Sequence, residues 1–96
     1  MPLFIAEHRH LAERCPAQDP QSAGFLVRHL SAPEAERHGV HLHGEAVETG
    51  QHHLVLIVDA PEASTVSDYL APFAAAGSVE VHPASSCETV AARGHC

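Results

Sequence analysis

The sequence predicts an α+β domain with elements in the order strand, helix, strand, strand, helix, strand. Three observations support this: a long β-hairpin pattern in the middle of the chain, a helical pattern on each side of it, and a short strand pattern near each end. With 96 residues, 45% of them hydrophobic, the chain has the length and composition of one globular domain. We place this domain at residues 1–83 and a C-terminal tail at residues 84–96.

The hairpin pattern occupies residues 40–59, and both of its arms are rich in strand-forming residues. A turn at Gly50 would pair Val47 with His52. Because side chains alternate between the faces of a sheet, one face would form the core with Leu42, Gly44, Ala46, Val55 and Ile57. The other face would carry His41, His43 and Glu45 beside Leu54, Leu56 and Val58. We expect this second, mixed face to carry the function.

Two shorter segments predict the outer strands. The first begins at Leu3, and alternation puts four side chains on one face: Phe4, Ala6, His8 and His10. The last strand pattern covers residues 78–82 and is expected to stop at Pro83, which lacks a backbone N–H. In the tail, residues 88–93 could form one or two helical turns.

The first helical pattern follows Asp19-Pro20, where Asp19 suits the N-cap and Pro20 the first helical position. An apolar stripe at helical spacing follows, formed by Ala23, Leu26, Val27 and Leu30. A second capping signal at residues 31–34 predicts that the helix breaks and restarts there. We expect Gly39 to end it in the left-handed conformation.

The second helical pattern follows the hairpin at Pro61, with Asp59 expected to cap it. Its apolar stripe consists of Ala63, Val66, Leu70 and Phe73. Pro72 lies inside this pattern and removes a backbone hydrogen bond, so we expect a kink or a short second segment there. Gly77 is expected to end the helix.

This element order is that of the ferredoxin-like βαββαβ sandwich, a four-stranded antiparallel sheet with two helices on one face. The other face of such a sheet is open. An open face that carries Leu54, Leu56 and Val58 would aggregate unless it were covered. We therefore expect a homodimer in which a second copy covers this face.

The chain also resembles the dimeric α/β-barrel superfamily of small bacterial proteins. The resemblance rests on the element order and on a late pattern formed by residues 70–73, Gly77 and residues 79–83. It implies that two open sheet faces meet in a dimer, and that ligands lie between sheet and helices or at the dimer seam. The superfamily includes haem-degrading enzymes, cofactor-free monooxygenases, isomerases and His-rich members that bind nickel. The doubled His-x-His pairs and the three cysteines depart from its pattern.

The charge of the chain argues against two classes of partner. The formal net charge is −7, and five arginines without any lysine cannot form the basic surface that nucleic acids or anionic membranes require. No segment approaches the roughly 20 apolar residues of a membrane span. A signal peptide has a basic start followed by a long apolar run, and the N-terminal residues show neither feature. We therefore expect a cytoplasmic protein.

Ten histidines dominate the candidate functional residues. On a strand, residues two apart lie about 7 Å from each other on one face, so a His-x-His pair can converge on one ion. We expect the two pairs to gather toward one end of the sheet, with Cys15 in reach. The predicted metal ligands are therefore His8, His10, His41, His43 and Cys15. Imidazole with thiolate favours zinc, copper or nickel. Haem is less favoured because aromatic residues are only 4% of the chain.

Three alternatives to a metal site remain open at the sequence level. The first is a cofactor-free enzyme for a small organic substrate, with His8 or His41 as base and Asp59 as its orienting carboxylate. The second is a thiol-based redox protein that uses Cys15, Cys87 and Cys96. The third is that the histidines only pack and form hydrogen bonds at a dimer seam.

The positions of the remaining histidines in the sequence do not favour a functional role. His52 and His53 would form a solvated strand start at the turn end of the hairpin, opposite His8. Three others are expected to be surface or capping residues: His29, His38 and His82. His95 could bind a metal only if the tail docked on the domain.

Overall fold

The computed structural model describes residues 1–96 as an α+β fold with one four-stranded antiparallel sheet. The strands are β1 (Leu3–Arg9), β2 (His41–Val47), β3 (His53–Asp59) and β4 (Ser78–Ala84). The helices are α1 (Pro20–His29), α2 (Ala32–Arg37), α3 (Ala63–Tyr69), α4 (Ala71–Ala74) and α5 (Cys87–Arg93). Two 3-10 turns, η1 (Ala12–Arg14) and η2 (Pro16–Gln18), lie between β1 and α1.

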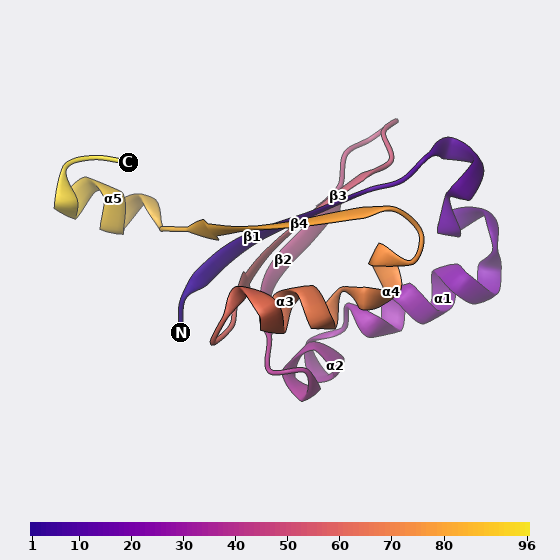
Figure 1. Ribbon diagram of the computed structural model, residues 1–96, viewed down its shortest axis with the longest axis horizontal. Coiled ribbons are helices and arrows are strands. Elements are labelled where there is room, and N and C mark those ends of the chain that lie inside the picture. Colours follow the sequence, from indigo (N-terminus) through magenta and orange to yellow (C-terminus); the bar gives the residue numbers. More distant parts are fainter.

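The strands are arranged in the order β2-β3-β1-β4, and helices α1 to α4 lie together on one side of the sheet (Figure 1). The predicted α+β class and the four-stranded antiparallel sheet are confirmed. Helix α5 extends beyond the end of β4, away from the other helices and at the opposite end of the molecule from α1 (Figure 1). None of the helices has the length and apolar character needed to cross a membrane.

The predicted helix boundaries are mostly confirmed. Asp19 caps α1 by accepting a hydrogen bond from the backbone N–H of Ser22, and α2 restarts after a break at Ser31. Gly39 ends this segment with φ of 77°. The second predicted helix is likewise split, into α3 and α4, and Pro72 lies in the first turn of α4.

Three predicted boundaries are wrong. Helix α4 ends at Ala74, so Gly77 does not end it. Glu62 occupies the N-cap position of α3, and Asp59 belongs to β3, so Asp59 is not a helix cap. Strand β4 continues through Pro83 to Ala84 instead of stopping at Pro83. The sheet tolerates this proline because β4 is an edge strand, where a missing N–H can face away from the ladder.

The predicted hairpin register is also wrong. Val47 pairs with Leu54 rather than His52, because the turn is longer than expected and is closed by a hydrogen bond from Glu48 N to His53 O (2.9 Å). Gly50 lies in this turn with φ of 79°, as predicted. An irregularity between Leu42 and Gly44 then shifts the pairing by one residue, which is the effect of a β-bulge.

The predicted core face of the hairpin is wrong as well. The helices cover the face that carries Leu54, Leu56 and Val58, which are at most 5% exposed. Ile57, predicted for the core, is 45% exposed on the uncovered face. Both faces of β3 are apolar, so alternation could not show which face the helices would cover. The core also includes the side chains of Phe4, Ala6, Val66, Tyr69, Leu70 and Phe73.

Candidate functional site

A cavity of about 320 Å³ lies between α1 and the end of the sheet where β1 finishes and β3 begins. Leu26 of α1 and Leu30, which caps the C-terminal end of α1, form one wall. Val47 and Leu54 form the wall on the sheet. Phe73 of α4 closes part of the space. The polar groups of the lining include His8, His10, His52, Cys15 and Glu45. The cavity is therefore mostly apolar, with a cluster of imidazoles at the strand ends.

Three of these histidines form a hydrogen-bonded chain. His8 Nδ1 lies 2.9 Å from the carbonyl oxygen of Ser78, and a carbonyl can only accept, so His8 donates through Nδ1. His10 Nδ1 is 2.9 Å from His8 Nε2, and His52 Nδ1 is 3.2 Å from His10 Nε2. With all three rings neutral, each Nδ1–H therefore donates to the next acceptor, and Nε2 of His52 keeps a free lone pair.

Burial favours the neutral form of two rings of this chain. The side chain of His8 is almost fully buried, and this desolvation lowers its pKa, while its hydrogen bond to Ser78 works in the opposite direction. Desolvation also lowers the pKa of His10, and the neighbouring charges of protonated His8 and His52 would lower it further. Neutral imidazole is the form that binds a metal or accepts a proton.

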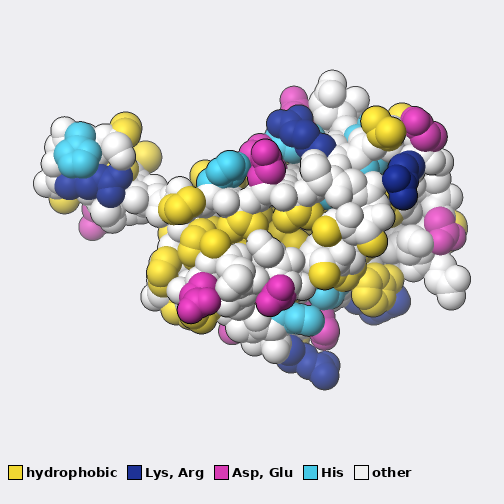
Figure 2. Space-filling view, viewed as in Figure 1, with side chains coloured by type: hydrophobic (Ala, Val, Ile, Leu, Met, Phe, Trp, Pro, Cys, Tyr) yellow, Lys and Arg dark blue, Asp and Glu magenta, His cyan; other side chains and the backbone are white.

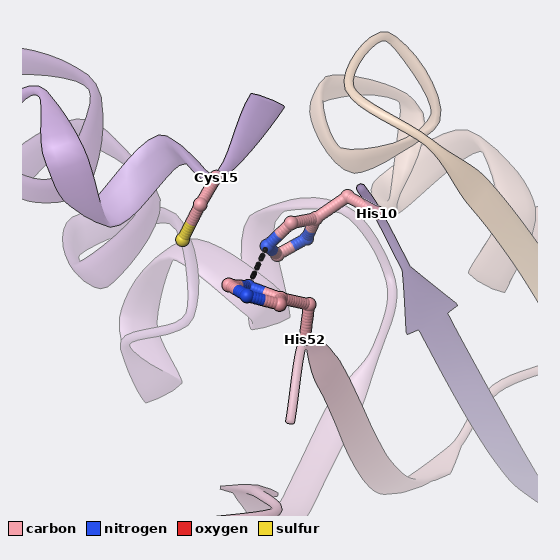
Figure 3. Close-up of side chains that lie close together, drawn as sticks. All are labelled: His10, Cys15 and His52. Atoms are coloured by element: carbon pink, nitrogen blue, oxygen red, sulfur yellow. Dashed lines mark hydrogen bonds between the residues drawn. The ribbon is translucent and has the colours of Figure 1, made fainter. Parts of the chain in front are cut away.

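Cys15 completes this cluster from the loop between η1 and η2. Its thiol, His10 and His52 each offer one ligand atom, and these atoms all lie within 4.8 Å of one another. Figure 3 shows that the Cys15 thiol and the His52 ring lie on the same side of His10. The three side chains are half-buried, so the cluster is partly shielded from solvent.

The second predicted His-x-His pair lies elsewhere. His41 pairs with Asp59 at the far end of β3, whereas His8 pairs with Leu54 near its start. His43 lies at the bulge and contacts the Asp59 carboxylate through Nε2 at 2.8 Å, and His41 Nδ1 lies 2.9 Å from Glu36 Oε1. The predicted gathering of both pairs is therefore wrong, because β1 is antiparallel to β3 and its last residues lie near the start of β3.

The same geometry separates the residues predicted for acid–base chemistry. Asp59 lies at the end of β3 that pairs with Leu3, so it cannot orient His8 on the opposite face and at the opposite end of β1. Its partner is His43, which was predicted as a metal ligand. The predicted pairing of His8 with Asp59 is therefore wrong.

Sequence reasoning missed His52, which the structure brings into the cluster. The β1–β3 ladder pairs Arg9 with His53, and His10 N donates to His52 O at 3.3 Å just beyond it. This register places the side chains of His10 and His52 side by side. The signal lies in the strand pairing and not in local spacing, because antiparallel pairing of β1 with β3 brings the end of one strand to the start of the other.

The other two cysteines are remote from the cavity. Cys87 is the first residue of α5 and Cys96 the last residue of the chain, and both are exposed free thiols. Figure 1 shows α5 at the far end of the molecule from α1, which forms a wall of the cavity. The tail therefore adds no ligand to the His10 cluster in this structure.

The arginines form no continuous basic patch on the face shown in Figure 2, where dark blue side chains stand apart from one another. Acidic and histidine side chains alternate with them along the upper edge. Separately, Glu7, Glu80 and His82 lie close together on the uncovered face of β1 and β4. The arrangement agrees with a net charge of −7.

Residues 4–95 match a protein family described as "Domain of unknown function (DUF3303)". The match covers the whole sheet apart from the first residue of β1, and it extends through α5. No curated protein matches the chain.

Proposed function

The chain belongs to the DUF3303 family, and we propose that it is a small transition-metal-binding protein with its centre at His10, Cys15 and His52. The observation that carries this proposal is the convergence of two imidazoles and a thiol from three separate segments. Zinc bonds of about 2.1–2.3 Å hold ligand atoms roughly 3.3–3.6 Å apart. His10 Nε2 and His52 Nδ1, at 3.2 Å, already have about this spacing. On metal binding the ion would replace the hydrogen bond between them, and the proton of His52 would be carried by its Nε2.

The donor set indicates which metals fit. Two imidazoles and a thiolate suit zinc, copper or nickel better than magnesium or calcium. Three protein ligands leave one position of a tetrahedral zinc ion open, as in catalytic rather than structural sites. The apolar cavity adjoins the three ligands, so a small molecule could reach that position. Haem fits less well, since Phe73 is the only large aromatic side chain in the lining.

His8 would support the centre without binding the ion. His8 Nε2 accepts a hydrogen bond from His10 Nδ1, and His8 Nδ1–H donates one to Ser78 O. A histidine ligand commonly donates its second ring N–H to such a partner, which fixes the tautomer and the ring orientation. Nε2 of His10 is thereby kept as the ligand atom. His8 is thus a positioning residue in this proposal, rather than the ligand expected from the sequence.

Metal analysis of untagged protein purified without chelator tests the proposal. We expect zinc titration of the Cys15→Ser and His52→Asn variants to show about one equivalent less bound metal than wild type. The matched control is the double variant His41→Asn/His43→Asn, which removes two histidines from the other end of the sheet and should bind as wild type does. Equal zinc binding by wild type and Cys15→Ser/His52→Asn would overturn the proposal.

A cofactor-free enzyme is the second candidate function. It is favoured by one observation: the chain of three imidazoles lies in the lining of an apolar cavity large enough for a small organic molecule. His52 at the end of that chain would act as the base, in place of the predicted pair with Asp59. Binding of an organic ligand that persists in the presence of a chelator, and is lost in His52→Asn, would favour this candidate.

The fold and the thiols support three finer proposals. The strand order β2-β3-β1-β4 is compatible with a ferredoxin-like sandwich of the dimeric α/β-barrel type, with a homodimer formed through the uncovered face. Three free thiols favour a reducing compartment such as the cytoplasm. A thiol-based redox role for Cys87 and Cys96 predicts an altered response to peroxide in Cys96→Ser.

A further inference from the structure

A second histidine cluster lies at the junction of α1, α2 and α3. Its centre is His29, the last residue of α1, which is only 6% exposed. The His29 ring stacks on Tyr69 at a centroid distance of 4.7 Å and on Phe25 at 5.8 Å. Burial of a titratable ring among aromatic side chains is costly unless its polar atoms have partners.

The hydrogen bonds of His29 define which of its nitrogens is free. Nε2 donates to the carbonyl oxygen of Tyr69, and the Tyr69 hydroxyl donates in return to the carbonyl of His29 at 2.8 Å. A neutral imidazole that donates through Nε2 carries its lone pair on Nδ1. No hydrogen bond in the structure uses Nδ1 of His29. The ring is thus held in one tautomer, and its Nδ1 has no protein partner but is not cut off from solvent.

Two further ligands come from α2 and its C-terminal cap. Glu34 and His38 are four residues apart, which places them on one side of the helix, and His38 Nε2 lies 3.6 Å from Glu34 Oε1. One ligand atom from each of His29, Glu34 and His38 lies within 4.8 Å of the others. The His38 ring also meets the His29 ring edge to face at 5.1 Å.

We propose that His29, Glu34 and His38 form a second metal site, separate from the His10 cluster and suited to a divalent ion such as zinc. Two imidazoles and one carboxylate are a common zinc donor set with one position left for water. The Tyr69 carbonyl that fixes Nε2 of His29 is the outer partner that histidine ligands commonly have. The ion would neutralise the Glu34 carboxylate.

The position of this site suggests what the ion would do. His29 ends the helix whose Leu26 forms a wall of the cavity, and Glu34 and His38 belong to the next segment. An ion held by all three would fix the angle between α1 and α2. Because α1 forms one wall of the cavity, the ion would also fix that wall. The second site is therefore expected to be structural, even though it has an open position.

The test uses a background variant that lacks the first cluster, Cys15→Ser/His52→Asn. We expect this protein to bind about one equivalent of zinc, and to lose it when either His38→Asn or Glu34→Gln is added. The matched controls are His41→Asn and Glu36→Gln, which remove the same side-chain types nearby but outside the cluster. Because His38 is exposed and Glu34 partly exposed, both test variants should fold, as circular dichroism would show.

This experiment can exclude either of the two proposed metal sites without excluding the other. If the background variant binds no zinc, or if His38→Asn leaves its binding unchanged, the second site is excluded. If the background variant binds as much zinc as wild type, the first site is excluded and the second is unaffected. Cobalt gives a second readout, because only the Cys15 site should show thiolate-to-metal charge-transfer absorption. A thiolate band in the background variant would contradict a second site made of two imidazoles and one carboxylate.

Discussion

His8 is the side chain on which the geometry of the first cluster depends most. It is nearly inaccessible to solvent, its ring packs edge to face on Phe73, and it links Ser78 to His10 by hydrogen bonds at both nitrogens. An imidazole fixed in this way determines which nitrogen of His10 is left free. Loss of His8 should therefore weaken metal binding without removing a ligand.

Substitution His8→Gln tests this role. Removal of an outer partner of a metal ligand typically lowers affinity about 10- to 100-fold, so we expect a loss of this size with the number of bound ions unchanged. Competition with a chromophoric chelator measures the affinity. His95→Gln in the exposed tail is the matched control and should bind as wild type does. If His8→Gln lost a whole equivalent of metal, His8 would be a ligand and the sequence-based assignment would be correct.

Four residues show which parts of the candidate site could be predicted from the sequence and which could not. His10 and Cys15 were expected to lie close together. His10 directly follows the first strand and Cys15 lies in the loop after it, so their short separation in the sequence is enough to predict their proximity. His52 and His43 were misplaced, since their positions depend on which strands pair and in which direction. Local patterns carry no information on strand pairing, so contacts between β1 and β3 could not be predicted from spacing alone.

Among the elements, the junction between α4 and β4 is sterically constrained at Gly77. A β-carbon at Gly77 would lie 2.1 Å from the carbonyl oxygen of Arg9 and 3.0 Å from the α-carbon of His10. These are backbone atoms of the segment that carries the first cluster, so they cannot move without shifting His10. Gly77 is therefore required by close approach of two chain segments rather than by its own φ angle.

We expect Gly77→Ala to destabilise the protein by more than about 2 kcal/mol, in the upper half of the usual range for overpacking or above it. Urea denaturation measures the difference. Gly44→Ala is the matched control, because a β-carbon there would meet no atom within 4 Å and its φ is not positive. It should cost no more than about 0.5 kcal/mol, as ordinary surface changes do. Similar losses in both variants would show that the contact with Arg9 is not the cause.

The elements also show why helices were easier to predict than the sheet. Asp19 and Gly39 mark helix ends by local capping chemistry that does not depend on distant residues. The β2–β3 register instead depends on turn length and on the bulge next to Leu42. A bulge leaves little trace in the sequence, yet it moves His41 and His43 relative to Glu45.

For the molecule as a whole, the buried imidazoles link stability to pH. The pKa values of His8 and His10 lie below the ordinary 6.5 in the folded state, with desolvation as the main cause. As the pH falls through 6.5, the unfolded chain takes up protons that these folded residues do not bind. Their contribution to stability is therefore full above 6.5 and is lost as the pH falls from there toward the folded pKa.

We expect the free energy of unfolding of the metal-free protein to decrease between about pH 7 and pH 5, and to decrease less steeply in His8→Gln. Urea denaturation at several pH values, with a chelator present, measures both slopes. His95→Gln should keep the wild-type slope, because its ring is exposed in the tail. An equally steep decrease in His8→Gln and wild type would show that His8 does not contribute to the pH dependence.

The uncovered face of the sheet leads to a prediction about assembly. Ile5 and Ile57 pair directly across β1 and β3 and are 38% and 45% exposed, while the helices cover only the opposite face. Apolar side chains in the middle of an open sheet are stabilised when a second copy covers them. Ile57→Glu would place a charge at that contact but leave the chain's own core unchanged. We expect wild type to sediment as a dimer and Ile57→Glu as a folded monomer.

Leu11→Glu serves as the matched control, since Leu11 is also exposed (63%) but lies outside the sheet, in the loop after β1. It should remain dimeric. Sedimentation equilibrium over a range of concentrations separates these outcomes, and circular dichroism verifies that both variants are folded. A monomeric wild type, or a dimer that persists in Ile57→Glu, would rule out the open face as the interface. The apolar pair Ile5–Ile57 would then be exposed surface, and the resemblance to dimeric α/β barrels would extend to the sheet but not to its assembly.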